Sequence, residues 1–93
     1  MNKYEAMFIV KPDLGEEERK NLFVQIGDVI TKNQGTIIQA SVWSERRKMN
    51  FTIKKCLEGV YYLVNFSLEP SLIVKLKEAY KLNEAILRVL ITK

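Results

Sequence analysis

The segment from Val60 to Leu68 constrains the fold most, because apolar residues occupy every second position along it. Successive side chains of a strand point to opposite faces of a sheet, so this alternation predicts a strand with one face in a core. The predicted core face carries Val60, Tyr62, Val64, Phe66 and Leu68. The opposite face carries Tyr61, Leu63, Asn65 and Ser67. Tyrosine and leucine on an uncovered sheet face indicate a surface for a partner.

Two strands and a helix are predicted before this segment. The run Tyr4–Val10 is apolar and aromatic-rich, which predicts a strand buried on both faces in the centre of a sheet. A helix with an acidic first turn begins at Glu16 and ends at Gly35, which we expect to adopt the left-handed conformation. The β-branched segment Thr36–Trp43 predicts a second strand, and its imperfect alternation favours an edge position with a bulge.

A second helix and a last strand are predicted after the alternating segment. Pro70 marks the first turn of the helix, and the lysines outside its apolar stripe predict a solvated surface. The last strand spans Ala85–Ile91, with a predicted core face of Leu87, Val89 and Ile91. Its predicted open face carries Ile86, Arg88 and Leu90. An arginine in the middle of a strand belongs on the uncovered face, because burying an unpaired charge is costly.

The predicted order of elements is strand, helix, strand, strand, helix, strand. Two helices on a four-stranded sheet cover one face and leave the other open. The predicted fold class is therefore α+β: a ferredoxin-like split βαβ sandwich (βαββαβ) with an antiparallel sheet, two helices on one face, and the first and third strands central. A chain of 93 residues can bury one core, so we expect a single domain over residues 1–93.

Two clusters of cations lie between the second and third predicted strands. They are Arg46-Arg47-Lys48 and Lys54-Lys55, and they flank the apolar residues Met49, Phe51 and Ile53. Cations of this kind neutralise phosphates, and interleaved apolar residues anchor a loop or stack on a base. The net charge of +4 also favours an anionic partner. The stretch therefore predicts a protruding hairpin that contacts a polyanion, although a solvated hairpin with ordinary surface lysines fits the same charges.

Several functional classes lack their characteristic residues. The chain has no histidine, which removes the commonest general base and metal ligand, and it has a single cysteine, Cys56. A lone thiol fits a reducing compartment and forms no internal disulfide. No glycine-rich phosphate loop and no apolar run of membrane-spanning length is present. We therefore expect a cytoplasmic protein with no cofactor, no metal, no small-molecule substrate and no membrane contact.

Several short pieces along the whole chain match a pattern that is specific in its order. The first piece is Tyr4-Glu5, an apolar strand, and then Lys11-Pro12-Asp13-Leu14. The middle pieces are Gly35, Trp43, the basic triplet, Met49-Asn50-Phe51-Thr52-Ile53-Lys54-Lys55, Glu58-Gly59 and Tyr61-Tyr62. The last piece is Ile86-Leu87-Arg88-Val89-Leu90-Ile91, with a final Lys93. No piece is diagnostic alone, but in this order and spacing they resemble the bacterial ribosomal protein S6 family of the small subunit.

The resemblance implies a non-catalytic role in the ribosome, in which the protein binds 16S ribosomal RNA together with ribosomal protein S18. Together with the basic stretch, it gives an expected rRNA-binding set of Lys3, Tyr4, Arg46, Arg47, Lys48, Phe51, Lys54, Lys55 and Arg88. The expected partner-protein surface is Tyr61, Leu63, Ile86 and Leu90.

Two other functions remain open at this point. The first is a stand-alone module of the same topology that binds single-stranded RNA, since Gly59–Val64 faintly echoes the aromatic signature of such modules. It predicts tight binding to short oligonucleotides without a partner protein. The second is a small enzyme or ligand-binding domain, for which Cys56 is a candidate nucleophile without an obvious base. Thermal stabilisation by a metabolite would support it.

Overall fold

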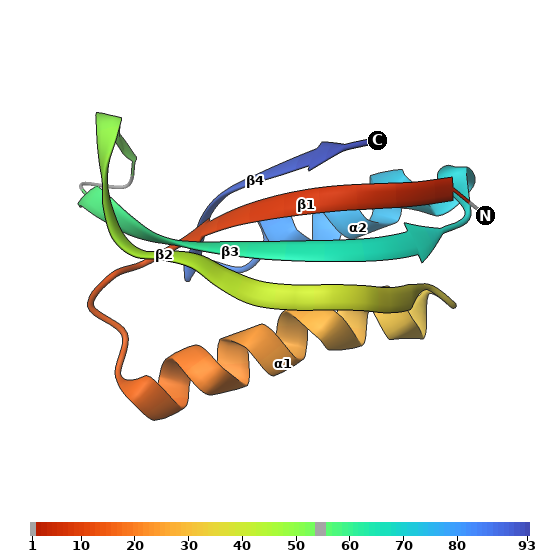
Figure 1. The fold of residues 1–93 in the computed structure, drawn as a ribbon, viewed down its shortest axis with the longest axis horizontal. Coiled ribbons are helices and arrows are strands. Elements are labelled where there is room, and N and C mark those ends of the chain that lie inside the picture. The colour runs from red at the N-terminus through yellow and green to blue at the C-terminus, as the bar shows by residue number, and fades with distance from the viewer. Residues whose placement is uncertain (1, 54–55) are drawn as a thin grey trace.

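A computed structural model describes the backbone of residues 2–53 and 56–93, and the side chains of residues 2–43 and 58–93. The elements are β1 (Asn2–Val10), α1 (Glu16–Lys32), β2 (Thr36–Ile53), β3 (Cys56–Leu68), the 3-10 turn η1 (Pro70–Leu72), α2 (Ile73–Lys81) and β4 (Ile86–Thr92). The sheet order is β2-β3-β1-β4, and every neighbouring pair is antiparallel. Figure 1 shows both helices on the same side of the sheet. The predicted ferredoxin-like fold is confirmed.

The central strands are β1 and β3, as the ferredoxin-like layout predicts. They pair without interruption from Asn2 with Leu68 to Val10 with Val60. The prediction that the first strand is buried on both faces is wrong, because Glu5 is exposed and Met7 is half-buried on the face without helices. The alternation predicted in β3 is present, because Val64 and Phe66 are buried while the neighbouring Leu63 and Asn65 are half-buried. This register fixes which side chains of β1 join each face of the sheet.

The helix α1 places Leu22, Ile26 and Ile30 in the core. Its end differs from the prediction, because Gln34 and not Gly35 has the positive φ, at 67°. The amide of Gly35 donates to the carbonyl of Ile30 at 2.9 Å, which is the 6→1 hydrogen bond of a Schellman motif. Glycine is needed at position 35 for space, because a Cβ there would lie 2.7 Å from Ile30 Cγ2 and 3.0 Å from the Ile30 carbonyl oxygen.

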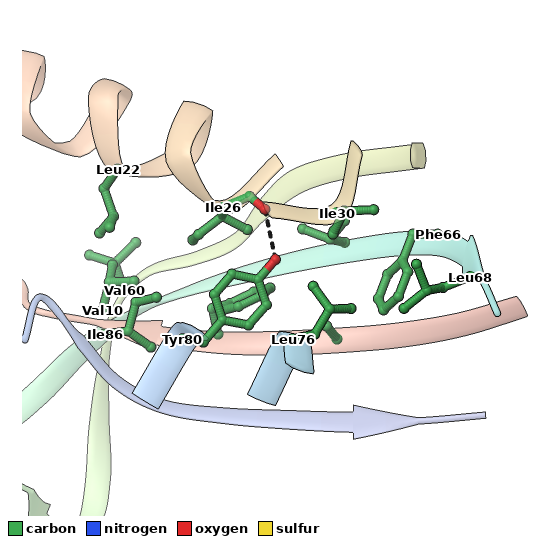
Figure 2. Close-up of a cluster of buried hydrophobic side chains, with 13 residues drawn as sticks. Val10, Leu22, Ile26, Ile30, Val60, Phe66, Leu68, Leu76, Tyr80 and Ile86 are labelled. Atoms are coloured by element: carbon green, nitrogen blue, oxygen red, sulfur yellow. Dashed lines mark hydrogen bonds between the residues drawn. The ribbon is translucent and has the colours of Figure 1, made fainter. Parts of the chain in front are cut away.

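One core lies between the sheet and the two helices (Figure 2). Phe8 on β1 is fully buried, and its ring meets the ring of Tyr80 edge to face with centroids 4.8 Å apart. Tyr80 on α2 also donates from its hydroxyl to the carbonyl oxygen of Ile26 on α1, at 2.7 Å. This buried hydrogen bond joins the two helices through the core, and it satisfies a polar group that would otherwise be costly to bury.

The environment of Tyr80 predicts a loss of stability in alkali. Burial, with a smaller contribution from the nearby Tyr62, raises the pKa of Tyr80 well above its usual value. In the unfolded chain tyrosine loses its proton at about pH 10, so above that pH the unfolded state binds fewer protons than the folded state and stability falls. Tyr80→Phe should cost about 1 kcal/mol at neutral pH and flatten this fall. Urea unfolding of the unmodified chain and the variant between neutral pH and pH 11 measures the free energy of unfolding at each pH. If this free energy falls equally with pH in both proteins, Tyr80 is not the group responsible.

The strand β4 carries a β-bulge that changes which residues face the core. Ile9 of β1 pairs with Arg88, but the next residue, Val10, pairs with Ile86, so Leu87 is an extra residue in β4. The prediction that Ile86 shares the open face is therefore wrong, since its side chain is 4% exposed and belongs to the main core. The prediction that Leu87 lies in that core is also wrong, because Leu87 packs with Ile9 in a separate cluster.

The hairpin of β2 and β3 is longer than predicted. The sequence predicts that the second strand ends at Trp43, whereas β2 continues to Ile53. Backbone pairing persists along this extension, with Arg47 opposite Gly59 and Lys48 opposite Glu58, and the register shifts several times. Figure 1 shows the far ends of β2 and β3 leaving the sheet as a two-stranded arm, which we call the β2–β3 arm and define as residues 44–53 and 56–59. The predicted bulge at the edge strand is confirmed.

Candidate functional site

The uncovered face of the sheet, here called the open face, is built from cross-strand rows that the register defines. In one row Ile9 of β1 lies between Tyr61 of β3 and Arg88 of β4. In the next row Met7 lies between Leu63 and Leu90. The third row is polar, with Glu5 between Asn65 and Thr92. The open face is therefore apolar near the β2–β3 arm and polar toward the start of β1.

A small apolar cluster forms the part of the open face nearest the arm. Ile9 and Leu87 are both less than a tenth exposed and pack together apart from the main core, and Tyr61 packs against them. Trp43 of β2 contacts Tyr61 with ring centroids 5.7 Å apart and keeps 51% of its surface exposed. Leu90 on the edge strand is 48% exposed. Large apolar side chains that stay this exposed beside a packed cluster mark a surface suited to a partner.

The structure brings together three of the four residues predicted as a partner-protein surface. Leu63 and Leu90 flank Met7, and Tyr61 occupies the neighbouring row. Ile86 is the exception, because the bulge in β4 turns it into the main core. Four further residues belong to this surface that the sequence did not predict there: Trp43, Met7, Ile9 and Leu87. Trp43 falls at a register shift between Val42 and Ser44, and only the backbone pairing reveals that shift.

The predicted RNA-binding residues with described side chains are divided between two ends of the sheet. Arg88 is exposed and pairs with Ile9 in the row nearest the arm. Lys3 lies six residues before Ile9 in β1, where it pairs with Ser67. Six residues of strand span about 20 Å, so the two cations do not share one local site. Tyr4 does not join the open face, because its ring stacks on Phe66 at 5.7 Å and packs against the main core.

The remaining predicted RNA-binding residues lie in or beyond the arm. The backbone of Arg46, Arg47, Lys48 and Phe51 belongs to β2, and their side chains are outside the described part of the structure. Lys54 and Lys55 lie outside the described residues altogether. The backbone therefore carries the basic triplet along the arm, beyond the row of Tyr61 and Arg88.

The described residues offer no arrangement of metal ligands. Among side chains 2–43 and 58–93, no group of three Asp, Glu or Cys residues is placed to hold a metal ion. Within residues 2–53 and 56–93, no helix is both long and apolar enough to pass through a membrane.

A comparison with family models decides what kind of protein this is. The model described as ribosomal protein S6 matches residues 3–93. The chain belongs to the ribosomal protein S6 family. This family consists of structural, non-enzymatic components of the small ribosomal subunit, so the predictions of the family and of a non-catalytic protein are confirmed.

Curated relatives and a solved structure agree with the S6 family assignment. A small ribosomal subunit protein bS6 of Helicobacter pylori strain P12 is 43% identical over 93 residues, which are all of this chain and 65% of that protein. The bS6 protein of Thermoanaerobacter pseudethanolicus is 39% identical over all of this chain and 97% of its own length. The crystal structure of 30S ribosomal protein S6 from Thermotoga maritima superimposes with a TM-score of 0.88 at 31% identity, covering 97% of this chain and 84% of that one. The chain thus spans less than two thirds of the length of its H. pylori relative.

Proposed function

We propose that this chain binds 16S ribosomal RNA together with ribosomal protein S18 in the bacterial small subunit, and that it acts in the cytoplasm. The observation that carries the proposal is the open face, where a partly exposed apolar cluster lies beside Arg88 and beside the arm that holds the basic triplet. Apolar and cationic surfaces in contact with each other suit a combined site for a protein and a nucleic acid.

The apolar rows are the proposed S18 contact. Tyr61, Leu63 and Leu90 are the members predicted from sequence, and Trp43 and Met7 extend the same surface. Partly buried aromatic side chains of this kind are frequent among the residues that contribute most to protein–protein affinity. A partner seated on these rows would leave the arm accessible to RNA.

The cations are the proposed RNA contacts. The residues proposed to neutralise phosphates are Arg46, Arg47, Lys48, Lys54 and Lys55 of the hairpin and Arg88 and Lys3 of the sheet. Contacts to phosphate position a protein without reading bases, so we expect recognition of the shape and backbone of folded RNA. Phe51 is the aromatic residue of the hairpin available to pack against the RNA. Because the ring of Tyr4 packs against the core, we propose that Tyr4 supports RNA binding by placing Lys3.

The proposal predicts that S18 strengthens RNA binding. The chain alone should bind 16S ribosomal RNA weakly, and addition of S18 should lower the apparent Kd by roughly tenfold or more, because two linked contacts then hold the RNA. A filter-binding titration of labelled 16S ribosomal RNA, with and without a saturating amount of S18, measures this. An apparent Kd that S18 leaves unchanged would contradict the proposal.

The described strands argue against a stand-alone module for single-stranded RNA. Such modules stack bases on aromatic residues of the two central strands. Here Tyr61 supplies an aromatic ring on β3, but the open-face residues of β1 are Lys3, Glu5, Met7 and Ile9. The same titration with short single-stranded oligonucleotides separates the two functions, since tight binding to them without S18 would favour the module.

A further inference from the structure

A groove runs between α2 and the edge strand β4, next to Leu87 and Arg88 at the border of the open face. Its volume is about 430 Å³. Buried or half-buried side chains of Tyr80, Ile86 and Val89 form its apolar floor, and the exposed side chains of Lys77, Lys81 and Arg88 line it. Because β4 is at the end of the strand order, no further strand within residues 2–53 and 56–93 pairs with its outer edge. Figure 2 shows Tyr80 and Ile86 near each other in the main core, and both line the groove.

The charges of the groove are all of one sign. Among the residues with described side chains that line it, three are cations and none carries a carboxylate. Lys77 and Lys81 are one helical turn apart, which places their Cβ atoms about 5–6 Å from each other. Like charges at this spacing repel and slightly destabilise an isolated helix. A bound anion reverses that cost, and arginine adds a planar donor group that fits phosphate oxygens.

The position of Arg88 connects the groove to the open face. Arg88 pairs with Ile9 in the row nearest the β2–β3 arm, and it also lines the groove. An RNA strand that contacts the arm and the open face can therefore continue over the edge of β4 toward Lys77 and Lys81. A peptide is a poorer occupant, since three cations would need carboxylates spaced to match them, whereas a nucleic-acid backbone carries a charge at every nucleotide.

We propose that the groove between α2 and β4 is a second RNA contact, which holds the sugar–phosphate backbone of a strand that passes over the edge of β4. Lys77 and Lys81 bind phosphates, and Arg88 joins this contact to the open face. The proposal rests on the proposed function, and it adds a side of the molecule that the sequence analysis predicts to be merely solvated.

The test is a double variant, Lys77→Gln with Lys81→Gln, in the full chain with S18 present. Filter binding to purified 16S ribosomal RNA over a range of salt concentrations should show a salt slope smaller by about two, one for each lysine. The affinity at about 0.1 M salt should fall roughly tenfold to a hundredfold. The matched control is Lys20→Gln with Lys75→Gln, which removes the same charge from exposed helix positions outside the groove and should leave the slope unchanged.

Each outcome decides a different point. If the unmodified chain fails to bind 16S ribosomal RNA, the proposed function and this inference both fall. If it binds and the groove variant has the same slope as the control, the groove inference alone falls. Weakened S18 binding at an unchanged salt slope would make the groove a protein contact and would also overturn it. Thermal unfolding of the variants checks that the fold is intact, which we expect because both lysines are exposed.

Discussion

Phe8→Ala is expected to lower the free energy of unfolding by about 3–5 kcal/mol. Phe8 has no exposed surface and lies on the central strand β1. Its ring meets Tyr80 at 4.8 Å and Tyr62 at 6.4 Å, so truncation removes contacts to α2 and to β3 together. The neighbouring rings belong to other elements, so we expect them to fill the space only in part. The loss therefore combines the transfer of the ring with the cost of a cavity.

Urea unfolding of the variant and of a matched control measures this effect. Met7→Ala is the control, because Met7 is the adjacent residue of the same strand but is half-buried on the open face. We expect Met7→Ala to cost about 1 kcal/mol, with an unchanged dependence on urea in both variants. Equal losses at the two positions would show that the helix side of β1 is not the main core. Should Phe8→Ala fail to fold, Phe8→Leu offers a milder version of the same comparison.

The parts of the fold that sequence predicted correctly are those with a single buried face. In β3 the alternation from Val60 to Leu68 is uninterrupted, so it predicted both the strand and which of its faces is buried. The same alternation applies in β1, where Tyr4 lies two and four residues before the buried Ala6 and Phe8. The side chain of Tyr4 is therefore on the core face of the strand. The resemblance to the S6 family placed Tyr4 among RNA contacts, but the alternation of the strand decides where its ring lies.

The parts that sequence could not predict depend on backbone pairing. Ile86 and Leu87 are both large and aliphatic, so nothing in their chemistry shows where an extra residue shifts the phase of β4. The bulge exchanges their faces, and the candidate partner surface changes with them. The extension of β2 to Ile53 is similar, because the charged residues 45–48 interrupt the apolar run that predicts the second strand, and only the backbone pairing shows that the strand continues. Trp43 also lies at a register shift of β2, so only the backbone pairing reveals that its ring contacts Tyr61 on the open face.

The largest functional effect is expected from the triple variant Arg46→Ala, Arg47→Ala and Lys48→Ala. Three consecutive cations on the arm lie beyond the row of Tyr61 and Arg88, where an RNA seated beside the open face would pass. Each phosphate contact releases condensed counterions, so its removal lowers the salt slope by about one. We therefore expect a slope smaller by about three, and an affinity for 16S ribosomal RNA that falls on the order of a hundredfold or more at about 0.1 M salt.

The matched control for this variant removes the same number of positive charges from positions outside the arm. Lys20→Ala, Lys32→Ala and Lys75→Ala also remove three positive charges from the total of +4, but these lysines are exposed on the two helices. Because unlocalised attraction depends on net charge, a simple polycation would lose affinity equally in both variants. A contact made by the arm predicts a large loss in the first variant and little change in the second. Filter binding at several salt concentrations separates the two, and equal slopes would show that the basic triplet does not touch the RNA.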